Sequence, residues 1–437
     1  MRLPRDHPQR LELNDEVHAR PPEALVPPLR LSFLALFSDL SARDREREHV
    51  AELARRFGQP GPAPGANHYS ADLGPFRVKW ERHTEFARYK VIVPGADEYP
   101  FADPALWALP AGWAEALPGQ LMVAAHAALV PGTDEPPDYD AISARLFGGN
   151  VLVGSRIAGG AATALTDLRV HGDGFSRFLV LNRGMTPRQA GRMVQRLLEV
   201  ETYRMLALLA LPVARGLAPH LDASERDLAT ITGALAAGDG ADRKDEPALL
   251  DRLTGLEAEI ERRLSDNHYR FSAAAAYHEL VRRRIVELRE ERLQGLQTLE
   301  EFTERRLAPA MSTCQAVAAR QESLSQHVAR ATQLLSTRVD IARERQNQAL
   351  LASMDRRARM QLRLQQTVEG LSVAAVTYYV VGLVGYAAKG LAAAGVGIDP
   401  DVAMGASVPL VLLLVWFGIR RIREVLARKG VKRVNHG

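Results

Sequence analysis

Two uncharged apolar runs near the C-terminus form the strongest hydrophobic pattern in the chain. They cover residues 370–388 and 402–419. Each run is close to the about 17–25 residues that a helix needs to cross the hydrocarbon layer of a bilayer. The connector, residues 389–401, is too short to form a domain. The pattern therefore predicts two transmembrane helices joined as a hairpin.

Basic residues flank both runs on the same side. Arginines precede the first run, and a basic tail, residues 420–437, follows the second, whereas the connector holds only Lys389 against Asp399 and Asp401. Because lysine and arginine stay on the cytoplasmic side, we expect both termini in the cytoplasm and the connector outside. The charge pattern therefore predicts an integral membrane protein with its basic flanks in the cytoplasm. The flanking basic residues are Arg356, Arg357, Arg359, Arg363, Arg420, Arg421, Arg423, Arg428, Lys429, Lys432 and Arg433.

A long amphipathic segment precedes the first run. Residues 310–366 contain neither proline nor glycine, and Pro309 separates them from what comes before. Apolar residues recur at steps of three and four, close to the seam of a coiled coil. We expect one stalk helix over residues 310–369 that continues into the first span and packs against other copies or the preceding helices. The seam residues are Leu324, Val328, Ala331, Leu335, Val339 and Ala342.

The middle of the chain is predicted to be helical. The segment Thr186–Gln189 combines Thr as N-cap, Pro at the first helical position and Gln at the capping-box position, and the helix it starts is expected to reach about Leu211. Further helices are predicted at residues 249–264 and 272–306. They form a helical region with a helical hairpin.

The N-terminal third mixes short apolar runs with turn residues. A helix is predicted at residues 42–57, with loops at residues 58–65 and 130–138. The runs predict strands, so we expect an α+β cytoplasmic domain of ordinary size. The strands are expected at residues 29–37, 77–80, 88–93, 120–130, 151–157, 161–170 and 178–181. The predicted parts of the chain are residues 1–185, 186–309, 310–369, 370–419 and 420–437.

Composition narrows the class of protein further. Hydrophobic residues make up 46% and charged residues 25% of the 437 residues, as in ordinary folded proteins. The single cysteine, Cys314, excludes an internal disulfide framework and zinc sites built on several cysteines. No apolar core follows the N-terminal charges, so no secretory signal is expected. The net charge of +4 is explained better by the basic membrane flanks than by nucleic acid, which we do not expect as a partner.

Four segments carry a resemblance to a known family. They are NDEVHARPP (residues 14–22), WERHTEF (80–86), LEVETYRMLALLALPVAR (198–215) and LRLQQTVEGLSVAAVTYYVVGLVGY (362–386). The chain resembles a proteobacterial family of uncharacterised membrane-anchored proteins over essentially its whole length. The resemblance implies an inner-membrane protein with a large cytoplasmic part.

The order of the predicted parts is also similar to that of CorA-type magnesium transporters. An α/β domain, a long helix that becomes the first span, and a second span with a basic tail follow one another in both. Those transporters carry a Gly-Met-Asn triplet at the outer end of the first span. The corresponding region here, residues 379–390, lacks that triplet, which puts selectivity for hydrated magnesium in doubt.

Few segments suggest chemistry. Asp15, Glu16 and His18 can ligate a metal or act as acid and base, or they can dock the N-terminal arm by hydrogen bonds and ion pairs. The glycines of HGDGFSR, residues 171–177, indicate a hairpin turn rather than a nucleophile site. The stretch Trp80–His83 is expected to end a strand with an exposed polar edge. Because no phosphate-binding loop or metalloprotease motif is present, we expect neither an enzyme nor a cofactor.

One face of the first span combines polar and small residues. Such a face can line the pore of a homo-oligomeric channel or transporter for an inorganic ion, or it can serve plain helix packing in the bilayer. The alternative function is a membrane-anchored scaffold or ligand-sensing protein without transport. The residues that would face the pore are Ser372, Ala375, Tyr379, Gly382, Tyr386 and Lys389.

Overall fold

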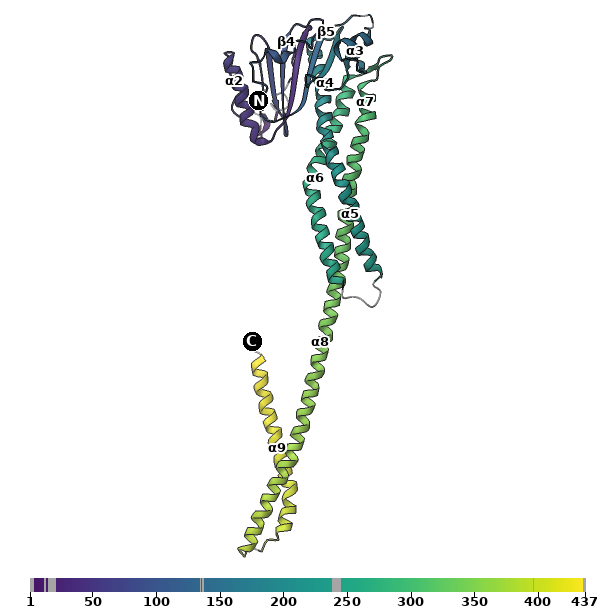
Figure 1. Cartoon of the computed structure of the whole chain (residues 1–437). Helices are drawn as coiled ribbons and strands as arrows, with labels where there is room; N and C mark the ends of the chain where they lie inside the picture. The colour runs from purple at the N-terminus through teal and green to yellow at the C-terminus, as the bar shows by residue number, and fades with distance from the viewer. Residues whose placement is uncertain are drawn as a thin grey trace. The chain divides into compact units, whose positions relative to one another are not determined.

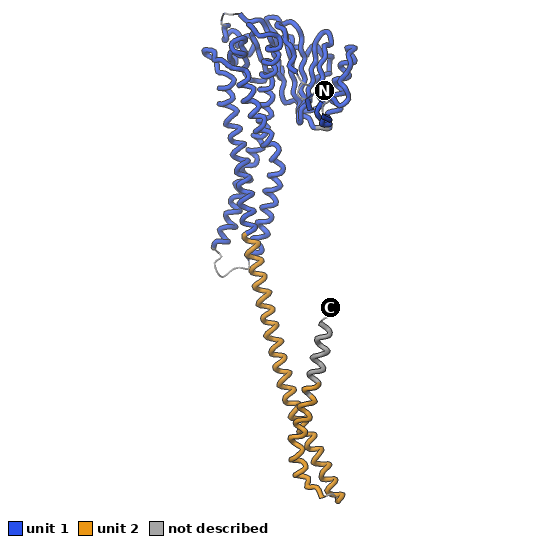
Figure 2. Tube along the Cα trace, turned by 180° about the vertical axis from the view of Figure 1, so that it is seen from behind, with its two compact units in different colours: residues 1–333 blue, residues 334–437 orange. Residues whose placement is uncertain are grey.

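The chain forms two compact units, Met1–Gln333 and Leu334–Gly437 (Figure 2). The first is an α+β unit, and the second consists of long helices that end in a two-helix hairpin. This arrangement confirms the predicted fold class. The computed structural model describes residues 4–11, 13–14, 21–133, 135, 137–237, 245–395 and 397–434, with the backbone alone at residues 40, 419 and 422–434.

A nine-stranded sheet is built by the described residues of the first unit. Its strand order is β2-β3-β4-β1-β5-β8-β7-β6-β9, and all neighbours are antiparallel except β5 and β8. The predicted strands are therefore confirmed, and the two at residues 77–80 and 88–93 form an adjacent pair. The strands are β1 Leu29–Phe37, β2 His68–Asp72, β3 Arg77–Arg82, β4 Phe86–Pro94, β5 Gln120–Pro131, β6 Val153–Ile157, β7 Ala162–Thr166, β8 Ser176–Asn182 and β9 Glu291–Arg292.

Helices cover both faces of this sheet, because side chains alternate between its faces. On β1, Leu31 and Phe33 join the core on the side of α4, whereas Leu34 and Leu36 join the core on the side of α2. Figure 1 shows α2 and α4 on opposite sides of the sheet. The helices of this unit are α2 Arg43–Arg56, α3 Tyr139–Leu146, α4 Pro187–Leu208, α5 Ala210–Ala237, α6 Glu246–Leu288 and α7 Leu299–Arg306, with short 3-10 turns at Leu40–Ala42 and Ala105–Ala108.

Helix α4 begins where the sequence predicted. Thr186 and Gln189 form the capping box, and the helix gives way at Leu209 to α5. Near its start, α4 passes so close to the N-terminal arm that a Cβ on Gly191 would lie 1.6 Å from the backbone oxygen of Glu23. Only glycine fits this crossing, and the amide of Leu25 donates to the carbonyl of Pro187 beside it.

The prediction of separate helices at residues 249–264 and 272–306 was wrong. Helix α6 runs without a break through residues 265–271, where the sequence has no proline or glycine, and it ends at Leu288. Arg289 then adopts a left-handed conformation with φ of 51°, which stops the helix. The chain adds β9 to the edge of the sheet and restarts as α7 through a capping box of Thr298 and Glu301.

The long helix α8, Ala308–Ala393, follows after the single residue Leu307. The break lies two residues before the predicted position, and Pro309 sits in the first turn of α8, where it needs no amide partner. Leu324 and Val328 of the predicted seam are buried. Arg320 of α8 pairs with Glu225 of α5 at 2.6 Å, so this part of the seam packs against the chain's own helices.

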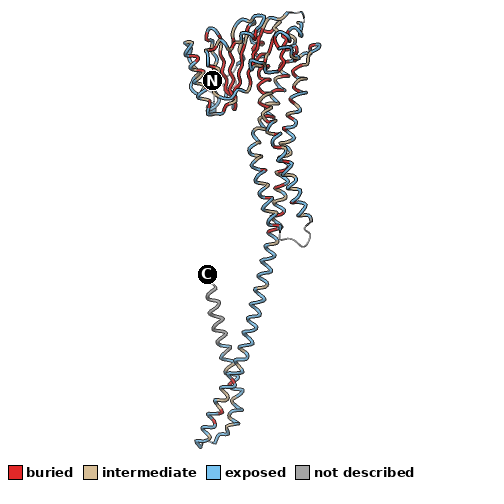
Figure 3. The backbone as a smooth tube through the Cα atoms, in the orientation of Figure 1, coloured by how far each residue is buried: buried red, intermediate tan, exposed pale blue. Residues whose placement is uncertain are grey.

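In the second unit, α8 and helix α9, Pro400–Val434, form a hairpin. Both contain a segment long and apolar enough to cross a membrane, which agrees with the two predicted spans. Only 17% and 6% of their most apolar windows are buried, so these are not the core helices of a globular unit. Figure 3 shows this exposure along the described residues of the hairpin, most of which are pale blue.

Candidate functional site

The six residues predicted to face a pore lie on one open side of α8 in the second unit. Tyr379 and Tyr386 are 71% and 77% exposed in the single chain. Gly382 is half-buried, and a Cβ on it would meet no atom within 4 Å. Ser372, Ala375 and Lys389 are exposed as well. The predicted face is therefore open toward the side chains of α9 that the structure describes.

A different side of α8 forms the hairpin. Thr377, Gly385 and Ala388 are buried on α8, and Val411 is buried on α9. A Cβ on Gly385 would lie 2.8 Å from the sulfur of Met404. Small residues allow this close approach, as is usual where helices associate in a bilayer. The hairpin thus uses Gly385 and leaves the face of Gly382 uncovered.

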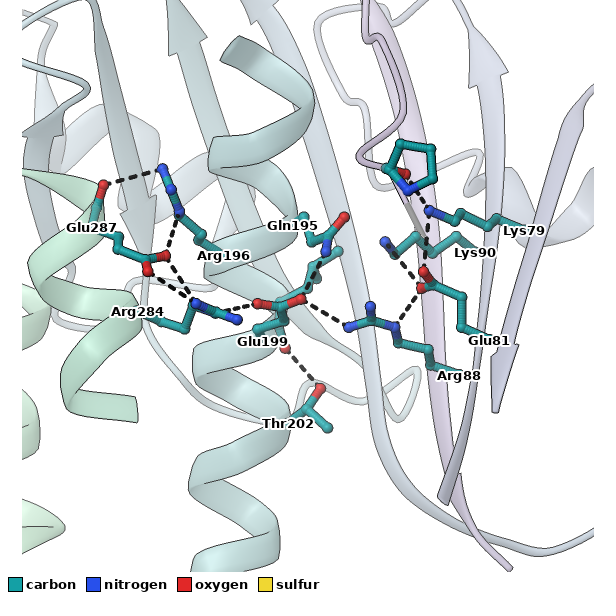
Figure 4. A network of polar contacts seen from close by, with 12 residues as sticks. Lys79, Glu81, Arg88, Lys90, Gln195, Arg196, Glu199, Thr202, Arg284 and Glu287 are labelled. Carbon is teal, nitrogen blue, oxygen red and sulfur yellow. Dashed lines mark hydrogen bonds and ion pairs between the residues drawn. The ribbon is translucent and has the colours of Figure 1, made fainter. Parts of the chain in front are cut away.

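The first unit contains a chain of buried charged side chains that we call the ionic relay (Figure 4). It starts on β3 and β4, crosses helix α4 and ends on α6. Side chains of opposite charge alternate along it, and those on the sheet and Glu199 are almost completely buried. Its members are Lys79, Glu81, Arg88, Lys90, Arg196, Glu199, Arg284 and Glu287.

Three cations surround Glu81 at the sheet end of the relay. Its carboxylate accepts a hydrogen bond from Arg88 Nε at 2.5 Å and lies 3.1 Å from Lys79 Nζ and 3.9 Å from Lys90 Nζ. Lys79 also donates to the carbonyl of Pro21 in the N-terminal arm at 2.7 Å. In the β3–β4 register, Lys79 stands directly opposite Lys90, a like-charge pair that costs stability unless a carboxylate shares it.

At its other end, the relay links the sheet to helices α4 and α6. Arg88 Nη1 donates to Glu199 of α4 at 3.0 Å, and Arg284 Nε of α6 donates to the other oxygen of the same carboxylate at 2.5 Å. Arg284 and Arg196 both donate to Glu287, at 3.0 and 2.9 Å. One unbroken set of charge-assisted hydrogen bonds therefore joins the sheet to α4 and α6.

Burial and charge oppose each other inside the relay. Burial would raise the pKa of Glu81, but the charges of Arg88, Lys90 and Lys79 outweigh it and hold this pKa at about 2. Burial, together with the charge of Arg88, lowers the pKa of Lys90 to about 7. The relay has five basic and three acidic members, so two positive charges are in excess when all are ionised. Lys90 is therefore the member of the relay that can lose its proton near neutral pH.

The structure corrects the prediction for the stretch Trp80–His83. Trp80, Glu81 and Arg82 are all buried, so this stretch is not an exposed strand end. Arg82 points to the opposite face of the sheet from Glu81 and pairs with Glu46 of α2 at 2.5 Å. A strand that alternates charged and apolar residues usually has one solvent-exposed face. Here both faces are covered, and only the contacts with residues distant in the sequence reveal it.

Other residues that suggested chemistry do not assemble into a reactive site. In residues 171–177, the Phe175 amide donates to Asp173, which closes a turn between β7 and β8. Ser176 donates to the carbonyl of Ala124 instead of a base, and His171 Nε2 lies 2.9 Å from Asp167. The turn interpretation is thus confirmed. The residues Asp15, Glu16 and His18 lie outside the described part of the chain.

A serine–histidine contact occurs elsewhere in the first unit, and no local sequence pattern indicates it. Ser32 Oγ lies 3.0 Å from Nδ1 of His126, whose ring stacks on Phe175. Both side chains are buried, and burial lowers the pKa of His126 to about 4. Ser32 Oγ also accepts a hydrogen bond from the amide of Leu106, so both groups serve internal contacts. Among the described residues, no cluster of three or more His, Cys, Asp or Glu side chains fits a metal ion.

An α+β unit followed by long helices and two apolar helices able to cross a membrane defines the class of this protein. The chain belongs to the family described as "Protein of unknown function (DUF3422)", whose model matches residues 5–426. No curated protein matches the chain. The match over nearly the whole chain confirms the resemblance to a family of uncharacterised proteins, and the likeness in layout to CorA-type transporters stays a prediction.

Proposed function

We propose that the chain is an integral protein of the bacterial inner membrane that senses a ligand or partner through its first unit. Both termini lie in the cytoplasm, and copies of the membrane hairpin associate. The observation that carries this proposal is helix α8. Its 86 residues include Met311 and Cys314 in the core of the first unit, and Gly385 and Ala388 in the hairpin. One helix therefore takes part in both units.

The core of the first unit supports a role in sensing. Met311 and Cys314 share one hydrophobic core with Phe33 of the sheet, Leu197 of α4 and Ile285 of α6. The ionic relay fixes the same sheet to the same two helices. Since close-packed interiors shift as connected units rather than deform continuously, a change at the sheet or at α4 is transmitted to the start of α8.

The uncovered face of the first span supports self-association. Tyr379 and Tyr386 carry hydroxyl groups that lipid tails cannot hydrogen-bond. Contact with another copy supplies partners for these hydroxyls and covers the small residues between them. Homo-oligomers with closed symmetry are the usual outcome of such a repeated contact.

Membrane topology is tested by cysteine labelling in a Cys314→Ser background. Gly397→Cys, in the connector, is expected to react with a membrane-impermeant maleimide added to intact cells, because the connector carries few basic residues. Gln346→Cys, which is exposed on α8 before the first span, should react only after the membrane is opened. The reverse pattern of labelling would contradict the proposed orientation.

A CorA-like channel or transporter is the second candidate. The observation that favours it is the same uncovered face, on which hydroxyl-bearing and small residues follow one another toward Lys389. If this face surrounds a pore, Gly382→Leu is expected to abolish ion flux in proteoliposomes while the oligomer mass stays unchanged, because the larger side chain narrows the path. The exposed, lipid-facing substitution Leu383→Ile serves as control. Wild-type protein that conducts neither cations nor simple anions would refute transport, and sensing would be the one proposed function that remains.

A further inference from the structure

A pocket of about 300 Å³ lies where three parts of the first unit meet. The loop after β7, helix α4 and the junction of α7 with α8 line it. Arginines from each part reach its wall: Arg169 from the loop, Arg204 from α4 and Arg306 from the end of α7. This volume suits a small ligand.

The charges around the pocket do not balance. Arg204 donates three hydrogen bonds to Glu201, from Nη2 to Oε1 at 2.7 Å and to Oε2 at 2.8 Å, and from Nε to Oε2 at 3.0 Å. The side chains of Arg169 and Arg306 have no hydrogen-bond or ion-pair partner among the described residues. Three guanidinium groups therefore face two carboxylates, those of Glu201 and Asp167, which leaves one positive charge in excess.

The carboxylate of Asp167 counts toward the charge of the pocket but pairs with neither the Arg169 nor the Arg306 guanidinium. It is buried and accepts hydrogen bonds from Nδ2 of Asn150 at 2.8 Å and from the backbone amide of Arg169 at 3.2 Å. His171 Nε2 lies 2.9 Å from its carboxylate as well. Its oxygens are thus used within the protein, and the guanidinium groups of Arg169 and Arg306 remain available to a ligand.

The rest of the pocket wall is apolar. Leu168, Leu208, Phe302 and Leu307 form it, and Leu168 and Leu307 are buried. Leu168 adopts φ of 53°, which is unfavourable for a side chain of this size. An inorganic anion would leave this apolar surface without a partner, whereas an apolar chain would cover it.

We propose that this pocket binds a carboxylate that carries a short apolar chain. The carboxylate lies between Arg169 and Arg306, whose planar groups suit a two-oxygen acceptor, and the chain lies on the apolar wall. A single negative charge matches the single excess positive charge. This inference rests on the proposed function and identifies its ligand: because α7 ends at Arg306 and α8 starts at Ala308, the ligand binds at the junction that begins the long helix.

Binding is tested with [1-¹³C]octanoate and the full-length chain in lipid nanodiscs, with empty nanodiscs to subtract partitioning into lipid. Octanoate is expected to give a bound carboxylate signal in the NMR spectrum. Acetate has the charge without the chain, and 1-octanol has the chain without the charge, so both should bind at least about tenfold more weakly. Octanoate that fails to bind the wild-type protein would overturn the proposal, as would equal binding of acetate or 1-octanol.

Two neighbouring arginines provide a matched pair of variants. Arg306→Gln and Arg169→Gln are expected to weaken octanoate binding about tenfold or more. Arg305→Gln also removes one positive charge, but Arg305 does not line the pocket, so this variant should bind octanoate like the wild type. Equal losses in Arg305→Gln and Arg306→Gln would show general charge attraction and overturn the site. Thermal melting of each variant shows whether its fold is kept.

Two further measurements distinguish a free carboxylate from a lipid headgroup and test the proposed function separately. A soluble short-chain phosphatidic acid offers a lipid headgroup, and tighter binding of it than of octanoate would overturn the assignment of a free carboxylate. The proposed function is tested separately, by the mass of the oligomer and the exchange of backbone amides along α8 with and without octanoate. Binding without either change would retain the site and refute its sensory role.

Discussion

Glu81→Gln is expected to destabilise the first unit by about 3–5 kcal/mol, because it leaves buried cations without their shared partner. Arg88 would keep Glu199, but Lys79 and Lys90 would face each other with no carboxylate between them. For a unit of this size the loss corresponds to a fall in melting temperature of roughly 10 °C. Circular dichroism of the full-length chain at pH 6 measures it.

The pH dependence of this loss follows from the two shifted groups. The pKa of Glu81 is lowered to about 2, so its contribution is present above its ordinary value, near 4.3, and is lost only as the pH falls toward 2. The pKa of Lys90 is lowered to about 7, so the cost of its buried charge is complete below pH 7 and fades above it. The difference between Glu81→Gln and wild type should therefore be larger at pH 6 than at pH 9.

Two variants serve as controls for the relay. Glu287→Gln removes a carboxylate from its more exposed end, where the side chain is 31% exposed, and should cost less than about 1 kcal/mol. Adding Lys90→Met to Glu81→Gln removes one of the unpaired cations and should recover part of the melting temperature, mainly at pH 6. Equal melting of Glu81→Gln and wild type at both pH values would contradict the role assigned to the relay.

The relay also shows what the sequence alone does not reveal. Local signals were sufficient for the strands at residues 29–37 and 120–130 and for the capping box at Thr186, because neighbours a few residues apart set those features. Glu81 and Arg88 instead depend on Glu199 and Arg284, which come from helices far along the chain. A charged strand with such partners looks in sequence like any strand with a solvated face.

The end of α6 illustrates the same limit at the level of the backbone. Arginine is a good helix former, so Arg289 gave no sign of a stop, and apolar residues continued at helical spacing beyond it. The helix ends there because Glu291–Arg292 pairs with the edge of the sheet at β6. Thr298 and Glu301, in contrast, form a capping box visible in the sequence, and it could have placed the start of α7.

The hairpin of α8 and α9 is a third place where the sequence alone does not reveal the contacts. Gly382 and Gly385 lie three residues apart in the same apolar run, so the sequence treats both as sites of close helix approach. The structure distinguishes them, because only Gly385 contacts α9. Gly385 therefore serves the contact within one chain, whereas Gly382 is open to a contact between copies.

Cysteines at these two glycines are therefore expected to behave oppositely in a Cys314→Ser background. A Cβ at position 385 would lie 3.9 Å from Cβ of Met404, which is within the range for a disulfide. Gly385→Cys combined with Met404→Cys should crosslink within one chain, and the product runs as a monomer on a non-reducing gel. Gly382→Cys alone should crosslink two chains, because its face is open in the single chain and is covered only by another copy.

Each variant controls for the other in this experiment. Gly385→Cys alone is shielded by α9 and should give little dimer, although it lies at nearly the same depth in the bilayer as Gly382→Cys. Dimers in equal amounts from both single variants would indicate random collision rather than a specific contact. If Gly382→Cys stays monomeric in lipid while the Gly385–Met404 pair closes, the hairpin is correct and the face of Tyr379 and Tyr386 contacts lipid. Association of copies through the first span would then be refuted, and with it a pore along that face.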